Sequence, residues 1–315
     1  MSLSVAPLYT DIHPGPAKGV AYWAQTADGK RIRLGYWPRE NARGTVLLFP
    51  GRTEYVEKYG PCAGDLAARG LACLTIDWRG QGLADRLLPD IRIGHVDVFD
   101  DYQRDVAAML DAARALDLPR PYFLLGHSMG GCIGLRAAME GLPVEACAFS
   151  GPMWGIHIAP HIRHIAGLLA QMMPRVGRGG QLLPGTRAEP YVLTEPFDDN
   201  MLTTDAQMYD MMRDQINAHP ELALGGPSFT WLREALAETA ALARRPAPNL
   251  PCVTWLGSNE RIVETGRIHR RMERWPGGRL EIVPGGEHEV LMETEAIREP
   301  VFDGIAELFL GRVAA

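Results

Sequence analysis

One stretch decides the fold of this chain: Phe123-Leu-Leu-Gly-His-Ser-Met-Gly-Gly131. Its first residues are apolar and predict a buried strand, and a helix rich in small residues begins directly after it. Glycines two positions before and after Ser128 permit a turn that is too tight for bulky neighbours. Such a turn projects the serine hydroxyl above the sheet at a helix N-terminus, where backbone N–H groups favour developing negative charge. The pattern predicts a nucleophilic serine; the alternative interpretation is a Gly-rich turn with an incidental serine.

The chain around this stretch alternates between strand-like and helix-like segments. Short apolar runs at 45–50, 71–77 and 144–150 predict buried strands, and helix-spaced apolar residues lie between them. Alternation with short connections predicts an α/β fold with a mostly parallel sheet covered by helices on both faces. Alternating segments around Asp28-Gly29 predict a hairpin, and therefore antiparallel strands at one edge.

The alternation breaks after Ser150 and resumes near Pro251. Residues 152–248 carry helix-type periodicity without clear strands. A helical insertion between two strands of one sheet is expected to lie over the carboxyl edge of that sheet. We therefore assign 1–151 and 249–315 to an α/β core, and 152–248 to a helical cap that is not an independent domain.

Length and composition limit the functional classes. With 315 residues and 46% hydrophobic content, the chain can form one large α/β domain with an insertion. Its net charge is −6 and it has no basic run studded with aromatic residues, so we expect no nucleic-acid partner. A weakly acidic chain gains little from an anionic membrane, and no apolar run reaches spanning length. Membrane contact is therefore expected to be transient at most, and the oligomeric state stays open.

The cysteines indicate the redox compartment. They are five in number and scattered, none forms a Cys-x-x-Cys pair, and most fall within apolar runs where they serve as small core residues. A reducing compartment fits this usage better than a disulfide framework. The first residues lack the charged and apolar regions of a signal peptide, so we expect a cytoplasmic protein. The five are Cys62, Cys73, Cys132, Cys147 and Cys252.

A nucleophilic serine needs a base, and the base needs an orienting acid. In α/β hydrolases, which share this serine turn, the chain order is serine, acid, histidine. His288 follows the last predicted strand, beyond the sheet edge that bears the serine, and is the expected base. The acid should follow the preceding strand, where Glu260 is the candidate. Glu264 is expected to begin the next helix, and Glu287 and Glu289 flank the histidine.

Two backbone N–H groups are needed to stabilise a tetrahedral oxyanion. Met129, directly after the serine, is expected to supply one of them. The loop after the strand at 45–50 is expected to supply the other. In that loop Gly51 permits a close turn beside the substrate, and the N–H of Arg52 is the candidate donor.

Four further segments accompany the serine turn. They are Phe49-Pro-Gly-Arg-Thr-Glu-Tyr55, Ile76-Asp-Trp-Arg-Gly-Gln-Gly82, Gly94-His-Val-Asp-Val-Phe-Asp-Asp-Tyr102 and Gly225-Gly-Pro-Ser-Phe-Thr-Trp231. With them, the chain resembles the bacterial lysophospholipases related to monoacylglycerol lipases, within the capped serine α/β hydrolases. Pro50 stands where that family often has histidine, and Glu260 stands where it usually has aspartate. The resemblance implies that Asp77 and Arg79 brace the loops around the site.

The predicted cap is rich in methionine, a residue that fills irregular space and suits an adaptable wall for an acyl chain. The candidates for substrate contact are Met153, Met208 and Met212, with Trp154 and Trp231. Ordinary packing of helices against the core explains the same residues equally well.

His157, His161 and His164 have a spacing typical of metal ligands, but Pro160 interrupts any helix that would align all three. We therefore expect no metal, and a serine hydrolase requires no cofactor.

These features predict a serine hydrolase that cleaves carboxylic esters through an acyl-serine intermediate. The expected partner is a small lipid-like ester, of lysophospholipid or monoacylglycerol type. One alternative is a peptidase, an amidase or a carbon–carbon bond hydrolase on the same scaffold. Another is a non-catalytic ligand receptor that has kept the fold and its pocket.

Overall fold

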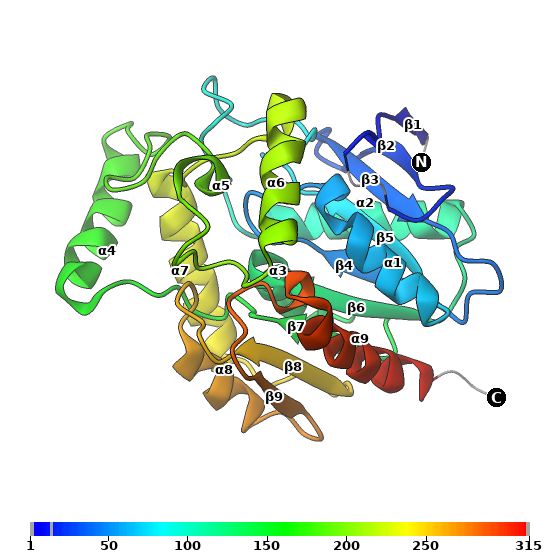
Figure 1. Ribbon diagram of the computed structural model, residues 1–315. Coiled ribbons are helices and arrows are strands. Elements are labelled where there is room, and N and C mark those ends of the chain that lie inside the picture. The colour runs from blue at the N-terminus through cyan, green and yellow to red at the C-terminus, as the bar shows by residue number, and fades with distance from the viewer. Residues whose placement is uncertain (1–2, 13–14, 313–315) are drawn as a thin grey trace.

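The computed structural model describes residues 3–12 and 15–312, and within them nine strands form one sheet (Figure 1). The strand order is β1-β2-β3-β5-β4-β6-β7-β8-β9. The pairs from β1 to β5 are antiparallel, whereas every pair from β5–β4 to β8–β9 is parallel. The strands are β1 (Ser4–Ala6), β2 (Val20–Gln25), β3 (Arg31–Trp37), β4 (Thr45–Phe49), β5 (Ala72–Asp77), β6 (Tyr122–His127), β7 (Cys147–Ser150), β8 (Cys252–Gly257) and β9 (Arg279–Val283). The mostly parallel sheet with an antiparallel edge is confirmed.

The central strands are apolar on both faces because both faces are covered. In β4, Val46 and Leu48 belong to one buried cluster, while Leu47 and Phe49 belong to the other. Successive side chains of a strand point to opposite faces, so a continuous apolar run is what a doubly covered strand requires.

Helices cover the two faces of the sheet. Helices α1 and α9 pack on one face, and α2, α3 and α8 pack on the other. These helices are α1 (Gly60–Ala68), α2 (Asp101–Ala115), α3 (Ser128–Met139), α8 (Thr265–Met272) and α9 (Glu295–Leu310), with short 3-10 turns η1 (Val56–Tyr59) and η3 (Val290–Met292).

The chain between β7 and β8 is helical, as the periodicity predicts (Figure 1). Its elements are α4 (Pro160–Arg175), α5 (Tyr191–Thr194), α6 (Ala206–Ala218), η2 (Pro220–Leu222) and α7 (Phe229–Arg244). Met211 and Met212 of α6 belong to the same buried cluster as α1 and α9, so this segment shares a core with the sheet. We propose that 152–248 is a cap on a core formed by 1–151 and 249–315, and the shared cluster supports the view that this cap is not an independent domain.

All five cysteines are buried and free, as expected of small core residues. Within the ranges given above, no helix has the length and apolar content needed to cross a bilayer.

Gly130 fixes the distance between α3 and β4. A Cβ added there would overlap the carbonyl oxygens of Phe49 and Pro50. We expect Gly130→Ala to lower the free energy of unfolding by about 3 kcal/mol, because the overlap is with rigid backbone. Urea unfolding followed by circular dichroism measures this change. Gly167→Ala in α4 is the control, because a Cβ there meets no atom within 4 Å. Equal effects of the two substitutions would contradict the expected overlap.

Candidate active site

Ser128 lies where β6 passes directly into α3. Its φ is +50°, in the left-handed region that residues other than glycine seldom adopt. The turn is compact: a Cβ at Gly126 would lie only 3.0 Å from the carbonyl oxygen of Gly130. Such strain at a reactive side chain is typical of catalytic turns and persists because the flanking strand and helix are both fixed.

His288 lies in the loop after β9 and directly contacts Glu260 in the loop after β8. The Nδ1 atom of His288 is 2.6 Å from Oε2 of Glu260, and the histidine ring is buried. The other oxygen of Glu260 accepts the N–H groups of Ile262 (2.7 Å) and Val263 (3.1 Å), which hold the carboxylate in place. The sequence therefore identified the histidine and carboxylate that meet, although glutamate is one methylene longer than aspartate.

The charges of this pair stabilise one another. Burial alone would lower the pKa of His288, but the Glu260 carboxylate outweighs burial and raises it. Burial alone would raise the pKa of Glu260, but His288 and the two backbone N–H groups lower it. The carboxylate is thus ionised at neutral pH and favours an imidazolium on its partner.

The other nearby carboxylates face elsewhere. Glu264 contacts Arg267 at 3.2 Å and Arg270 at 3.5 Å. Glu287 lies 3.6 Å from Arg261. Glu289 contacts Lys58 at 2.7 Å.

The loop after β4 runs beside the serine. A Cβ at Gly51 would lie 3.0 Å from Cβ of Ser128, so the backbone there reaches the serine. The indole of Trp78 donates to the Pro50 carbonyl (2.9 Å), and Gln81 donates to the Gly51 carbonyl (2.9 Å). This anchoring places the loop where the oxyanion donors are expected.

The Arg52 side chain contacts residues of the segment between β7 and β8. Its guanidinium donates to the Gly225 carbonyl at 2.7 Å and lies over the ring of Trp231. The backbone N–H of this residue, rather than its charge, is therefore the group suited to an oxyanion.

Asp77 and Arg79 brace the surrounding loops, as the resemblance implies. Asp77 accepts from Arg33 (2.7 Å) and from the N–H of Val56 (2.8 Å), the first residue of η1. Arg79 pairs with Asp105 and Asp28, each at 2.8 Å.

A cavity of about 710 Å³ opens beside Ser128 and His288. Its wall is mostly apolar and comes from both the core and the helical segment between β7 and β8. Among the lining residues are Met153, Ile162, Ile165, Leu169, Met212, Ile216, Phe229 and Trp231.

The structure separates the substrate-contact candidates into two groups. Met153, Met212 and Trp231 line the cavity. Trp154 does not: its ring packs against Phe149 and Trp275, and its Nε1 donates to the Gly131 carbonyl at 3.1 Å.

Met208 is also outside the cavity lining and packs half-buried against a core cluster. These two expectations were wrong because burial against the core satisfies the same apolar pattern. Gly51 approaches the site through its backbone beside Ser128.

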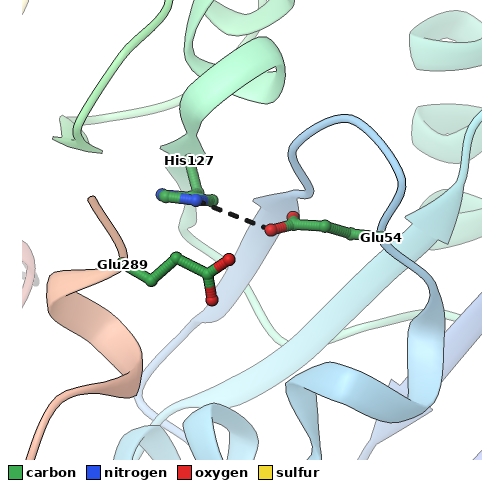
Figure 2. A group of neighbouring side chains, drawn as sticks. All are labelled: Glu54, His127 and Glu289. Carbon is green, nitrogen blue, oxygen red and sulfur yellow. Dashed lines mark ion pairs between the residues drawn. The ribbon is translucent and has the colours of Figure 1, made fainter. Parts of the chain in front are cut away.

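The sequence did not reveal a buried cluster at the end of the cavity. The carboxylates of Glu54 and Glu289 and the ring of His127 converge there, with ligand-type atoms within 4.8 Å of one another (Figure 2). Lys58 Nζ lies 2.7 Å from each of the two carboxylates, so an ammonium already supplies the positive charge. The spacing of Glu54 and Lys58, four residues apart, was the available signal.

The three histidines whose spacing is typical of metal ligands lie outside this cluster. Over residues 3–12 and 15–312, the group just described is the one set of His, Cys, Asp and Glu side chains that converges as metal ligands do. His157, His161 and His164 are not part of it.

Comparisons with known proteins identify the family of this chain. The profile of a hydrolase family described as serine aminopeptidase, S33, matches residues 40–295. The chain belongs to this family. It is 33% identical over 277 residues to lysophospholipase L2 of Escherichia coli K12, covering 84% of this chain and 79% of that protein. It is 25% identical to the monoglyceride lipase of Saccharomyces cerevisiae, covering 89% of this chain and 90% of that protein. The resemblance drawn from the motifs is confirmed.

Solved structures support the same fold. A soluble variant of the Saccharomyces cerevisiae monoglyceride lipase superposes with a TM-score of 0.72 at 23% identity, covering 98% of this chain and 99% of that chain. A carboxyl esterase of Bacillus coagulans superposes with a TM-score of 0.72 at 15% identity, covering 95% and 100%. The fold is that of the α/β hydrolases.

Glu260→Gln tests the histidine–carboxylate contact. The amide keeps the shape but loses the charge that orients the ring, so kcat for ester hydrolysis should fall about 10³–10⁴-fold. Glu264→Gln is the matched control and should cost little, because that carboxylate faces Arg267 and Arg270. Ser128→Ala sets the reference for complete loss, including loss of labelling by a fluorophosphonate probe. Near-normal kcat in Glu260→Gln would remove Glu260 from the site.

Proposed function

We propose that this protein hydrolyses carboxylic esters of lysophospholipids or monoacylglycerols through an acyl-enzyme intermediate. The observation that carries the proposal is a large apolar cavity that opens directly at Ser128 and His288, with His288 held by Glu260. Curated relatives over most of the chain carry the names lysophospholipase and monoglyceride lipase, which supports a lipid ester as substrate.

Each residue of the site has a defined role in the proposed reaction. Ser128 attacks the ester carbonyl while His288 takes the serine proton, and Glu260 stabilises the imidazolium. Backbone N–H groups of Arg52 and Met129 stabilise the oxyanion. His288 then protonates the leaving alcohol. Water activated by the same ring attacks the acyl-serine and releases the fatty acid.

The peptidase alternative is less well supported. An aminopeptidase must bind the free α-ammonium of its substrate, and a carboxylate is the natural partner of that group. Two carboxylates line the cavity near the serine, Glu54 and Glu289, but both are paired with the Lys58 ammonium. Most of the remaining wall is apolar and suits an acyl chain. A non-catalytic receptor would leave Ser128 unlabelled by a fluorophosphonate.

The apolar wall predicts how activity depends on acyl length. Each CH₂ buried in the cavity contributes about 0.8 kcal/mol, close to fourfold in kcat/KM. Medium or longer p-nitrophenyl esters should therefore exceed the acetyl ester by more than about tenfold. Met212→Gln should flatten the profile because Met212 lines the cavity, whereas Met208→Gln on the same helix should preserve it. A flat or falling profile in the unmodified protein would favour a peptidase or amidase.

The outer surface of α4 supports contact with a lipid surface. Leu168 and Met172, which do not line the cavity, are 57% and 48% exposed, and the cavity residues Ile162 and Ile165 are also partly open to solvent, at 46% and 60%. The segment 152–188 also contains four arginines and no aspartate or glutamate. The local charge is thus positive within a chain of net charge −6, which favours an anionic surface more than the overall charge suggests.

Leu168→Glu tests this contact, because Leu168 is exposed and is not a cavity residue. We expect binding to phosphatidylcholine vesicles containing phosphatidylglycerol to fall about tenfold, since a side chain that could enter the bilayer interface becomes charged. Hydrolysis of a soluble short-chain ester should be unchanged. Val5→Glu on β1 is the control for an exposed apolar residue elsewhere, at 76% exposure. Equal vesicle binding by both variants would contradict the contact.

The five buried free cysteines support a reducing compartment, and we propose that the protein acts in the cytoplasm.

A further inference from the structure

The buried cluster beside the active site carries charges that have no role in the reaction steps proposed above. Lys58 Nζ lies between Glu54 Oε1 and Glu289 Oε2, at 2.7 Å from each, and all three side chains are 5% exposed. The ring of His127 completes the cluster, with Nε2 3.5 Å from Glu54 Oε1 (Figure 2).

The members of this cluster come from three of the segments that form the active site. Glu54 lies on the loop expected to bind the oxyanion, and its second oxygen accepts the N–H of Gly51. Glu289 directly follows His288, and His127 directly precedes Ser128. Lys58 therefore connects the oxyanion loop to the histidine loop.

The cluster holds two carboxylates and one ammonium. Burial would raise the pKa of Glu54, but Lys58 lowers it to about 2, so this carboxylate is ionised. Burial lowers the pKa of His127 to about 3, so its ring is neutral at pH 7 and adds no positive charge. When Glu289 is also ionised, the cluster carries one net negative charge.

Glu289 is the member that responds to its surroundings. Its pKa is raised because burial and the negative charge of Glu54 outweigh the attraction of Lys58. A positive charge on His288 acts in the opposite direction and favours the ionised carboxylate. Ionisation of Glu289 and protonation of His288 therefore support each other.

The charged and titratable groups that face His288 come from four segments. Glu260 touches the ring at 2.6 Å from the loop after β8. The ring of His127, at the end of β6, lies 4.9 Å away between centroids. Glu54 and Lys58 approach from the segment after β4, and Glu289 lies on the histidine's own loop. Within the described part of the chain, Glu260 is the only one of these groups whose hydrogen bond orients the ring.

We propose that Glu289 and Lys58 set the proton affinity of His288 from opposite sides. The Glu289 carboxylate stabilises the imidazolium that forms when Ser128 attacks. The Lys58 ammonium limits this stabilisation, so that the ring is free to accept a proton in the resting enzyme. Neither side chain touches a reacting atom, and both are positioning residues that act through His288. The inference rests on the proposed esterase function for its catalytic meaning.

The test is the acid limb of kcat/KM against pH, which reports the pKa of the free enzyme's essential base. Removing a negative charge lowers the proton affinity of His288, so Glu289→Gln should move the limb to lower pH by about one unit. Removing a positive charge has the opposite effect, so Lys58→Met should move it to higher pH. A purely structural role would reduce activity without moving the limb in opposite directions.

Three further variants sharpen the comparison. Lys58→Arg keeps the charge and should restore the limb to its normal position. The double variant of Lys58→Met and Glu289→Gln changes no net charge, so its limb should return close to that of the unmodified enzyme. Glu287→Gln is the matched control, since that carboxylate flanks His288 but faces Arg261 at 3.6 Å. It should leave the limb unmoved.

The titration of the His288 ring is also measured directly by NMR, without any substrate. This readout separates the two proposals, because absence of ester hydrolysis would refute the function while the ring titration still tests the cluster. If Lys58→Met fails to fold, Glu289→Gln against Glu287→Gln decides. An unshifted ring pKa in folded Glu289→Gln, or an equal shift in Glu287→Gln, overturns the inference.

Discussion

The active site depends on a backbone that changes from strand to helix within a single residue. At Ser128 the chain takes a φ of +50°, which costs free energy for any residue that carries a Cβ. The turn is held because β6 pairs with β4 on one side, while α3 packs against the same strand through Gly130. A larger residue at Gly130 would push α3 away from the sheet, and the turn at Ser128 would no longer be held.

The pairing of β4 with β6 has a second consequence. Parallel neighbours end at the same edge of the sheet, so the loop after β4 lies beside the residue that follows β6. Gly51 thereby reaches Ser128, and the loop is anchored by Trp78 and Gln81 instead of by the substrate. The donors expected for an oxyanion are thus held in place before any substrate binds. Such groups stabilise a developing charge most effectively when they are already in position.

The remaining charges near the serine are organised in two layers. The contact between Glu260 and His288 fixes the orientation of the ring. Behind it, Glu54, Lys58 and Glu289 form an almost fully buried group, which is costly unless its charges compensate one another. The helical segment over this region supplies an apolar wall on its inner side and an apolar surface on the outer side of α4.

Local signals in the sequence were sufficient for the fold and for the residues that meet around the serine. Short apolar runs predicted the buried strands because both sheet faces are covered, and the glycines around Ser128 predicted the turn. His288 and Glu260 were predicted by chain order, since adjacent parallel strands deliver the loops that follow them to one edge. The sequence did not predict the direction in which individual side chains point. The same apolar pattern described Met212, which lines the cavity, and Trp154, which packs into the core. Only the tertiary structure decided these cases. Only it placed Lys58 between Glu54 and Glu289, because Lys58 and Glu289 are more than two hundred positions apart and such a contact leaves no periodic pattern in the sequence.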